Sequence, residues 1–200
     1  MTQSRTLDFW FELASTYSYP AFMRAGALAK AAGVGLRYRP FLLGPIFKAQ
    51  GMATSPFNLF PAKGRNMWRD LERICAALDL PFVQPQIFPQ ASVLAARVAL
   101  VGLAQNWGLA FCRAVYAAEF GAGRNIGEPE TIAAILAEIG QNAEAVIAQA
   151  QSDANKTALR TQTEEAQALG IYGAPSFVTS DGELFWGNDR LEAALAWASK

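Results

Sequence analysis

The chain has 200 residues, of which 52% are hydrophobic, so it suits one domain or one domain carrying an insertion. Its 17 basic and 17 acidic residues give a net charge of zero, and the absence of a basic tract argues against a nucleic-acid partner. No apolar run is long enough to cross a bilayer, which argues against a membrane partner, and the first residues lack the apolar core of a signal peptide. We therefore expect a cytoplasmic protein.

Histidine is absent, which excludes a Ser-His-Asp hydrolase, a Cys-His protease and any histidine-ligated metal site. Cys75 and Cys112 are the only cysteines, and they do not form a Cys-x-x-Cys pair. Each lies in an apolar helical pattern, so we expect buried free thiols. Chemistry in this chain must use hydroxyls, carboxylates, lysines, backbone groups or a bound cofactor, and we predict no metal site.

The chain is organised around a strand that runs directly into a helix. From Leu7 to Leu13 the side chains alternate with period two, which predicts a strand. After Pro20 the apolar residues recur at helical spacing as far as Ala29. The turn, residues 15–18, reads Ser-Thr-Tyr-Ser. A helix start presents unpaired N–H groups and a partial positive charge, so we expect an anion site here, suited also to a thiolate.

A second strand is predicted over residues 36–41, which makes the first part of the chain a parallel βαβ unit. Residues 42–62 are rich in glycine and proline and are predicted to be irregular. Such a long connection indicates a functional lid or binding loop. The helical period returns at Lys63 and continues to Leu78.

The middle of the chain is predicted to be helical, with strands returning only near the end. The predicted helices cover residues 91–120, with a break at Gly108, then 129–138, 142–151 and 154–168. Asp181 and Gly182 separate two strand-like runs and predict a hairpin. Asp189 followed by Glu192 resembles a capping box that opens a final helix.

These elements predict an α/β, thioredoxin-like fold, βαβ…ββα, with a large all-helical insertion. The thioredoxin-like domain is assigned to residues 1–41 and 160–200, and the inserted helical domain to residues 42–159. The thioredoxin redox turn corresponds to residues 15–18, where serines occupy both cysteine places. The protein itself therefore cannot cycle a dithiol.

The local sequence allows two interpretations of Ser15. Its hydroxyl could donate a hydrogen bond to a thiolate supplied from outside, or it could simply cap the helix, worth roughly 1 kcal/mol. The two roles are compatible.

The other candidate residues carry the same ambiguity between structure and function. Pro175 could merely begin a strand, or could form a cis bond that turns the backbone of Ala174 toward a peptide-like ligand. Asn188 and Asp189 could cap the last helix, or Asp189 could receive a ligand ammonium. Lys48 and Lys63 flank the proline-rich segment and are either solvated surface residues or a site for an acidic ligand. Four of the five tryptophans fit either the core or an aromatic pocket: Trp10, Trp68, Trp107 and Trp186.

Six segments together resemble 2-hydroxychromene-2-carboxylate isomerases and kappa-class glutathione transferases. They run through the chain in the same order as in those families. They are DFWFELASTYSY at 8–19, RPFLLGPIFK at 39–48, PAKGRNM at 61–67, RNIGEP at 124–129, GIYGAPSFV at 170–178 and LFWGNDRLE at 184–192. The chain departs from the pattern at Thr16, where the family usually has proline, and in residues 52–56, which lack the usual Gly-Asn-x-Pro-Pro.

The resemblance implies a dimer that binds glutathione. It implies that Ser15 bonds the glutathione sulfur and that Ala174, before a cis Pro175, pairs with the cysteinyl backbone. Asn188 and Asp189 would hold the γ-glutamyl end. Lys63 would hold the glycine end, and Lys48 would lie near a small aromatic carboxylate substrate.

The implied reaction is an isomerisation used in the breakdown of aromatic compounds. Glutathione thiolate adds to a conjugated double bond, the resulting single bond rotates, and elimination gives the trans isomer. Water or substrate oxygens could supply the proton shifts. A kappa-like glutathione transferase or peroxidase acting on another electrophile is the alternative, and a non-catalytic thiol or peptide binder is a third possibility.

Overall fold

The computed structural model describes residues 5–200, so the first four residues of the predicted thioredoxin-like domain lie outside it. A four-stranded sheet organises the fold, with strand order β2-β1-β3-β4. Strand β1 pairs in parallel with β2, whereas β3 is antiparallel to both β1 and β4. The strands are β1 (Thr6–Phe11), β2 (Gly35–Pro40), β3 (Ser176–Thr179) and β4 (Leu184–Trp186). The predicted parallel βαβ unit and closing hairpin are both confirmed.

The described chain between β2 and β3 contains helices and no strand, as predicted for the insertion. Helix α9 carries the chain back to the sheet and spans the assigned domain boundary between residues 159 and 160. The helices are α1 (Ser18–Ala32), α2 (Leu43–Ala49), α3 (Pro56–Leu59), α4 (Pro61–Ala77), α5 (Val93–Leu103), α6 (Gly108–Tyr116), α7 (Pro129–Glu138), α8 (Ala143–Ala150), α9 (Asp153–Ala168) and α10 (Leu191–Ala198), with a π-helix η1 (Ala117–Gly121) and a 3₁₀ turn η2 (Asn188–Arg190).

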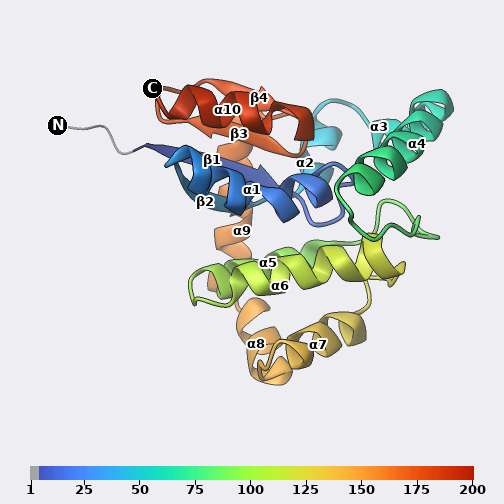
Figure 1. The fold of residues 1–200 in the computed structure, drawn as a ribbon. Coiled ribbons are helices and arrows are strands. Elements are labelled where there is room, and N and C mark those ends of the chain that lie inside the picture. The colour runs from blue at the N-terminus through green and yellow to red at the C-terminus, as the bar shows by residue number, and fades with distance from the viewer. Residues whose placement is uncertain (1–4) are drawn as a thin grey trace.

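The alternation in β1 sends its side chains into two different cores. Phe9 and Phe11 are fully buried on the face covered by α1 and α10, where Phe9 lies 5.8 Å from the ring of Phe22. On the other face Trp10 is fully buried in a smaller cluster with Ala166 of α9. Figure 1 shows the sheet with α1 and α10 beside it and the block of α5 to α8 below. Strand β1 is therefore held from both faces, and its C-terminal end is a rigid support for whatever follows it.

The prediction that residues 42–62 are irregular is wrong. This segment contains α2 and α3, and α4 begins at Pro61 rather than at Lys63. Pro56 and Pro61 stand in the first turns of α3 and α4, and the Ser55 hydroxyl accepts a hydrogen bond from the Phe57 N–H. Proline suits this position because its fixed φ is helical and the N–H it lacks would be unpaired there. The prolines thus start helices instead of marking a loop.

The remaining chain follows the sequence predictions closely. A break separates α5 from α6, which begins at Gly108, although the last turn before residue 121 is a π-helix. Cys75 and Cys112 are buried and unpaired, as predicted. Among residues 5–200, none of the helices combines the length and apolar character needed to cross a membrane.

Candidate functional site

The site lies at the turn between β1 and α1, as the strand-to-helix pattern indicated. Ser15 is buried there, and its hydroxyl oxygen accepts a long hydrogen bond, 3.4 Å, from the Ser18 N–H in the first turn of α1. The residue at the helix N-cap position is Tyr17, whose side chain makes no capping bond. Thr16, which replaces the usual proline, is buried, and its hydroxyl lies 3.3 Å from the sulfur of Met67 in α4.

Ser15 and Ala174 meet although they are 159 residues apart in the sequence. The Ser15 hydroxyl donates a hydrogen bond of 3.0 Å to the carbonyl oxygen of Ala174. The Ala174–Pro175 bond is cis, as the family resemblance implied. A second cis bond, Phe88–Pro89, was not anticipated and also lies at the site. The turn before α1 and the turn before β3 thus form two neighbouring walls.

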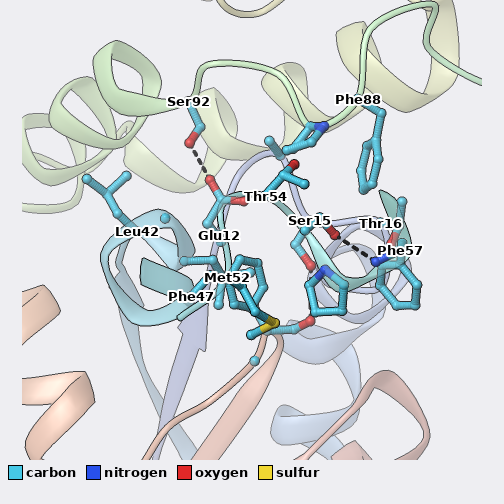
Figure 2. A pocket seen from close by; sticks show the side chains of 18 of the residues that line it. Glu12, Ser15, Thr16, Leu42, Phe47, Met52, Thr54, Phe57, Phe88 and Ser92 are labelled. Atoms are coloured by element: carbon cyan, nitrogen blue, oxygen red, sulfur yellow. Dashed lines mark hydrogen bonds between the residues drawn. The ribbon is translucent and has the colours of Figure 1, made fainter. Parts of the chain in front are cut away.

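A cavity of about 1000 Å³ opens beside these walls. Ser15, Ala174, Lys48 and Lys63 all line it, whereas Pro175, Asn188 and Asp189 do not. Its remaining wall is mainly apolar, and Figure 2 shows several of the side chains that form it. The apolar residues that line the cavity include Leu42, Phe47, Met52, Phe57, Phe88 and Val93. An apolar cavity with a few polar groups is the usual form of a small-molecule site.

The two predicted lysines belong to different helices around the cavity. Lys48 lies in the last turn of α2, and Lys63 lies in the first turn of α4 with its ammonium 4.9 Å from the ring of Phe60. Both are exposed. Two positive charges lining one cavity favour an acidic ligand.

Trp186 also lines the cavity and is 48% exposed, so this tryptophan belongs to the pocket, whereas Trp10 belongs to the core. Its ring lies 5.0 Å from that of Tyr172, another lining residue.

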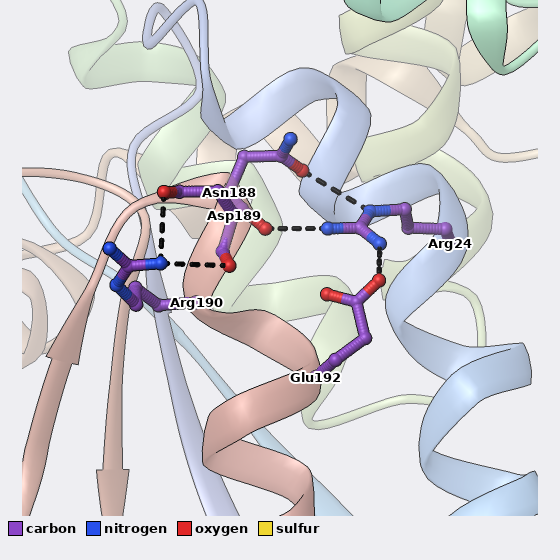
Figure 3. Close-up of polar contacts among 5 residues, drawn as sticks. All are labelled: Arg24, Asn188, Asp189, Arg190 and Glu192. Carbon is purple, nitrogen blue, oxygen red and sulfur yellow. Dashed lines mark hydrogen bonds and ion pairs between the residues drawn. The ribbon is translucent and has the colours of Figure 1, made fainter.

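Asn188 and Asp189 sit outside the cavity and have structural partners. Arg24 of α1 donates from its Nε to the Asn188 side-chain oxygen at 3.2 Å, and it also bonds the Asn188 carbonyl and pairs with Glu192 (Figure 3). Asp189 pairs with the adjacent Arg190 at 3.1 Å, and its side chain is 72% exposed. The predicted capping box is therefore wrong: neither η2 nor α10 has a side-chain cap, and Glu192 is held by Arg24 instead.

Asp189 nevertheless lies close to the α1 start. Burial and the hydrogen bond to Asp70 raise the pKa of Tyr17, and the negative charge of Asp189 adds to this effect. The Tyr17 hydroxyl donates to the Asp70 carboxylate of α4 at 3.0 Å. Tyr17 thus connects the turn to α4, and Asp70 is a residue of this region that the sequence did not single out.

A buried carboxyl at the cavity was also missed from the sequence. Glu12 directly follows β1, is 6% exposed and accepts a hydrogen bond from the hydroxyl of Ser92 (Figure 2). Burial is the main reason that its pKa rises to about 7, while the bonds from Ser92 and the Ala14 backbone act in the opposite direction. The alternation of side chains in residues 7–13 had indicated only that Glu12 is a polar residue of a strand. Its contact with Ser92, 80 residues away, has no sequence signal.

The sequence also matches a known family. Residues 6–196 match the model of the DSBA-like thioredoxin domain. The chain belongs to the DSBA-like thioredoxin family. The thioredoxin-like fold with a helical insertion is thereby confirmed.

Two curated relatives of this DSBA-like chain are each 29% identical to it. One is the 2-hydroxychromene-2-carboxylate isomerase of Sphingobium xenophagum, aligned over 94% of this chain and 95% of the relative. The other is glutathione S-transferase kappa 1 of Caenorhabditis elegans, aligned over 92% and 86%. A solved structure of a 2-hydroxychromene-2-carboxylate isomerase superposes with a TM-score of 0.84 at 26% identity, covering 96% of this chain and 95% of the other. The resemblance inferred from the six segments is confirmed.

Proposed function

We propose that this protein is a glutathione-dependent isomerase of 2-hydroxychromene-2-carboxylate or a closely related aromatic acid. The single observation that carries the proposal is the Ser15 hydroxyl at the α1 start, 3.0 Å from the Ala174 carbonyl, on the wall of an apolar cavity with two lysines. The relatives named above, isomerases and kappa-class transferases, support an enzyme of this kind.

Glutathione would bind between the two walls that carry Ser15 and Ala174. When the ligand enters, the Ser15 hydroxyl turns from the Ala174 carbonyl to the sulfur, and that carbonyl becomes free to accept from the cysteinyl N–H. The hydroxyl bond and the start of α1 both favour the thiolate over the thiol. Lys63 would hold the glycine carboxylate, and Asp189 and Asn188 the γ-glutamyl end, with Pro175 fixing the direction of the Ala174 backbone.

The cavity would hold the aromatic acid next to the sulfur. Lys48 would pair with its carboxylate or with an enolate oxygen that forms when the thiolate adds to the double bond. Rotation about the resulting single bond and elimination of glutathione complete the isomerisation, so glutathione is regenerated. The resemblance also predicts a homodimer, and light scattering on the purified protein would measure its mass in solution. The sequence itself led us to expect a cytoplasmic location.

The test is turnover of 2-hydroxychromene-2-carboxylate with and without glutathione, comparing the wild type with Ser15→Ala. We expect turnover that requires glutathione and falls by ten- to a hundredfold in the variant, the effect of losing one hydrogen bond to a charged group. Equal turnover by the two proteins would sink the catalytic role of Ser15. Turnover of chlorodinitrobenzene without any isomerisation would favour the kappa-like transferase, and binding of glutathione without either reaction would favour the non-catalytic binder.

A further inference from the structure

Glu12 occupies a special place among the residues that line the cavity. Of the described lining residues, it is the only one with a carboxyl, and the only other ionising side chains on that wall are Tyr17, Lys48, Lys63 and Tyr172. It follows the rigid strand β1 and precedes Ser15 by three residues, and its carbonyl accepts the Ser15 N–H at 3.1 Å. The same short turn therefore presents a hydroxyl and a carboxyl to one cavity.

The surroundings of Glu12 hold its carboxyl in place and keep it away from bulk water. Ser92, just before α5, donates to it, and the Tyr116 hydroxyl of α6 donates to its carbonyl at 3.0 Å. Glu119 of η1 is a second acidic group close to Glu12, and it is fully buried. Burial raises the pKa of Glu119 well above its usual range, and the charge of Glu12 raises it further. The pKa of Glu12 rises to about 7, so its carboxyl changes charge near neutral pH.

The reaction proposed above needs a proton to move between two substrate oxygens. The chromene acid is a ring-closed hemiketal, and thiolate can add only after the ring has opened to the conjugated keto acid. Opening requires loss of the proton on the hemiketal hydroxyl and gain of a proton by the ring oxygen. The chain has no histidine to carry it.

We propose that Glu12 is the catalytic residue that carries this proton, an inference that rests on the proposed function. The Glu12 carboxylate removes the proton of the hemiketal hydroxyl, and the carbon–oxygen double bond forms as the bond to the ring oxygen breaks. The electron pair of that bond goes to the ring oxygen, which leaves as a phenoxide. Glu12 then returns the proton to the phenoxide, so that no proton, electron or further reactant is gained or lost.

The test compares two substrates that differ in this one step. The cis isomer of benzylidenepyruvate, made by irradiation, has no ring hydroxyl and cannot close to a chromene, so its isomerisation needs only the thiolate. Glu12→Gln keeps the size of the side chain and the acceptor for Ser92 but cannot take a proton. Glu119→Gln makes the same substitution at a buried carboxyl that does not line the cavity, and it is the matched control.

We expect Glu12→Gln to lower turnover of the chromene acid by about a hundredfold, the usual size of a general acid–base contribution. Its turnover of cis-benzylidenepyruvate stays within about twofold of wild type, and Glu119→Gln stays near wild type on both compounds. Full activity of Glu12→Gln on the chromene acid, or an equal loss on both compounds, overturns the role of Glu12. If the wild type isomerises neither compound, the proposed function fails, and the role of Glu12 fails with it.

A second variant keeps the proposal testable if Glu12→Gln does not fold. Ser92 donates a hydrogen bond that lowers the pKa of Glu12. Ser92→Ala therefore moves the acid limb of the pH profile for the chromene acid to higher pH, because the base form of Glu12 appears later. The profile for cis-benzylidenepyruvate does not move. A chromene profile identical to that of wild type contradicts the proposal.

Discussion

At the scale of single residues, the fold buries three carboxyls of the described chain: Asp8, which pairs with Arg37, and Glu12 and Glu119, which have no salt-bridge partner among the described residues. Glu119 is 0% exposed, and neither of its oxygens has a hydrogen-bond partner among the described residues. Glu12 has Ser92 as a partner but is almost as deeply buried. Each of these two glutamates is destabilising once it is charged, because burial penalises the charged form. The folded protein therefore holds protons that the unfolded chain releases.

This difference predicts that stability falls as the pH rises. The folded-state pKa of Glu12, about 7, exceeds the ordinary value of 4.5, so between these values the folded state binds more protons than the unfolded state. As the pH rises from 5 to 8, the raised pKa of Glu12 alone lowers the free energy of unfolding by about 2 kcal/mol. The raised pKa of Glu119 acts in the same direction. Glu119→Gln should therefore be more stable than wild type at pH 8, with a flatter dependence on pH.

Urea unfolding at a series of pH values measures the pH dependence of stability in wild type and in Glu119→Gln. Wild type should lose stability steadily from pH 5 to pH 8, and Glu119→Gln should lose less. A variant with the same pH dependence as wild type would show that Glu119 does not release its proton on unfolding. Glu192 acts in the opposite direction. Burial tends to raise its pKa, but its hydrogen bonds and the charge of Arg24 together leave the pKa lowered, so its contribution to stability disappears as the pH falls.

At the scale of elements, the sequence predicted those parts of the fold in which local pattern and tertiary environment agree. The alternation in β1 and the Asp181–Gly182 turn each produced the expected element, because both faces of the strand are buried and the turn glycine has a φ of 88°. The prediction for residues 42–62 was wrong because proline disrupts the interior of a helix but is favoured in its first turn.

The junction between α5 and α6 gives a sharp prediction about packing. A Cβ at Gly108 would lie 2.3 Å from the backbone nitrogen of Leu103 and 2.5 Å from the backbone carbon of Gly102. These are backbone atoms, so the helices must separate to admit it. Gly108→Ala should lower the free energy of unfolding by roughly 1–3 kcal/mol, the range for overpacking.

Gly26 in the middle of α1 is the matched control for that substitution. A Cβ there meets Tyr38 and Arg113 only at 3.5 and 3.6 Å, an ordinary contact. Gly26→Ala should stabilise by up to about 1 kcal/mol, because alanine favours the helix interior. Thermal or urea unfolding of the two variants distinguishes them, and equal effects of the two substitutions would contradict this account of the helix junction.

At the scale of the whole molecule, the cavity is made where the inserted helices meet the end of the sheet. Its lining comes from the turn after β1, from the α2 to α4 segment, from the segment that leads into α5, from the turn before β3 and from the end of β4. The sequence could indicate Ser15 and Ala174 as site residues, because each lies next to a strand boundary that the residue pattern predicts. It could not indicate that Glu12 faces Ser92, because that contact depends on how two distant segments dock. It also did not show that Asn188 holds Arg24.

In the proposed function, the α1 start and Ser15 hold a thiolate that belongs to bound glutathione. The direct measurement is a pH titration of the ultraviolet absorbance of the thiolate in the complexes of wild type and Ser15→Ala with glutathione. We expect the bound thiol of wild type to ionise well below the ordinary cysteine pKa of about 8.5. In Ser15→Ala its pKa should rise by about 1–2 units, equivalent to one hydrogen bond to a charged group. A bound thiol that stays protonated at neutral pH in wild type, or the same titration in both proteins, would contradict the account.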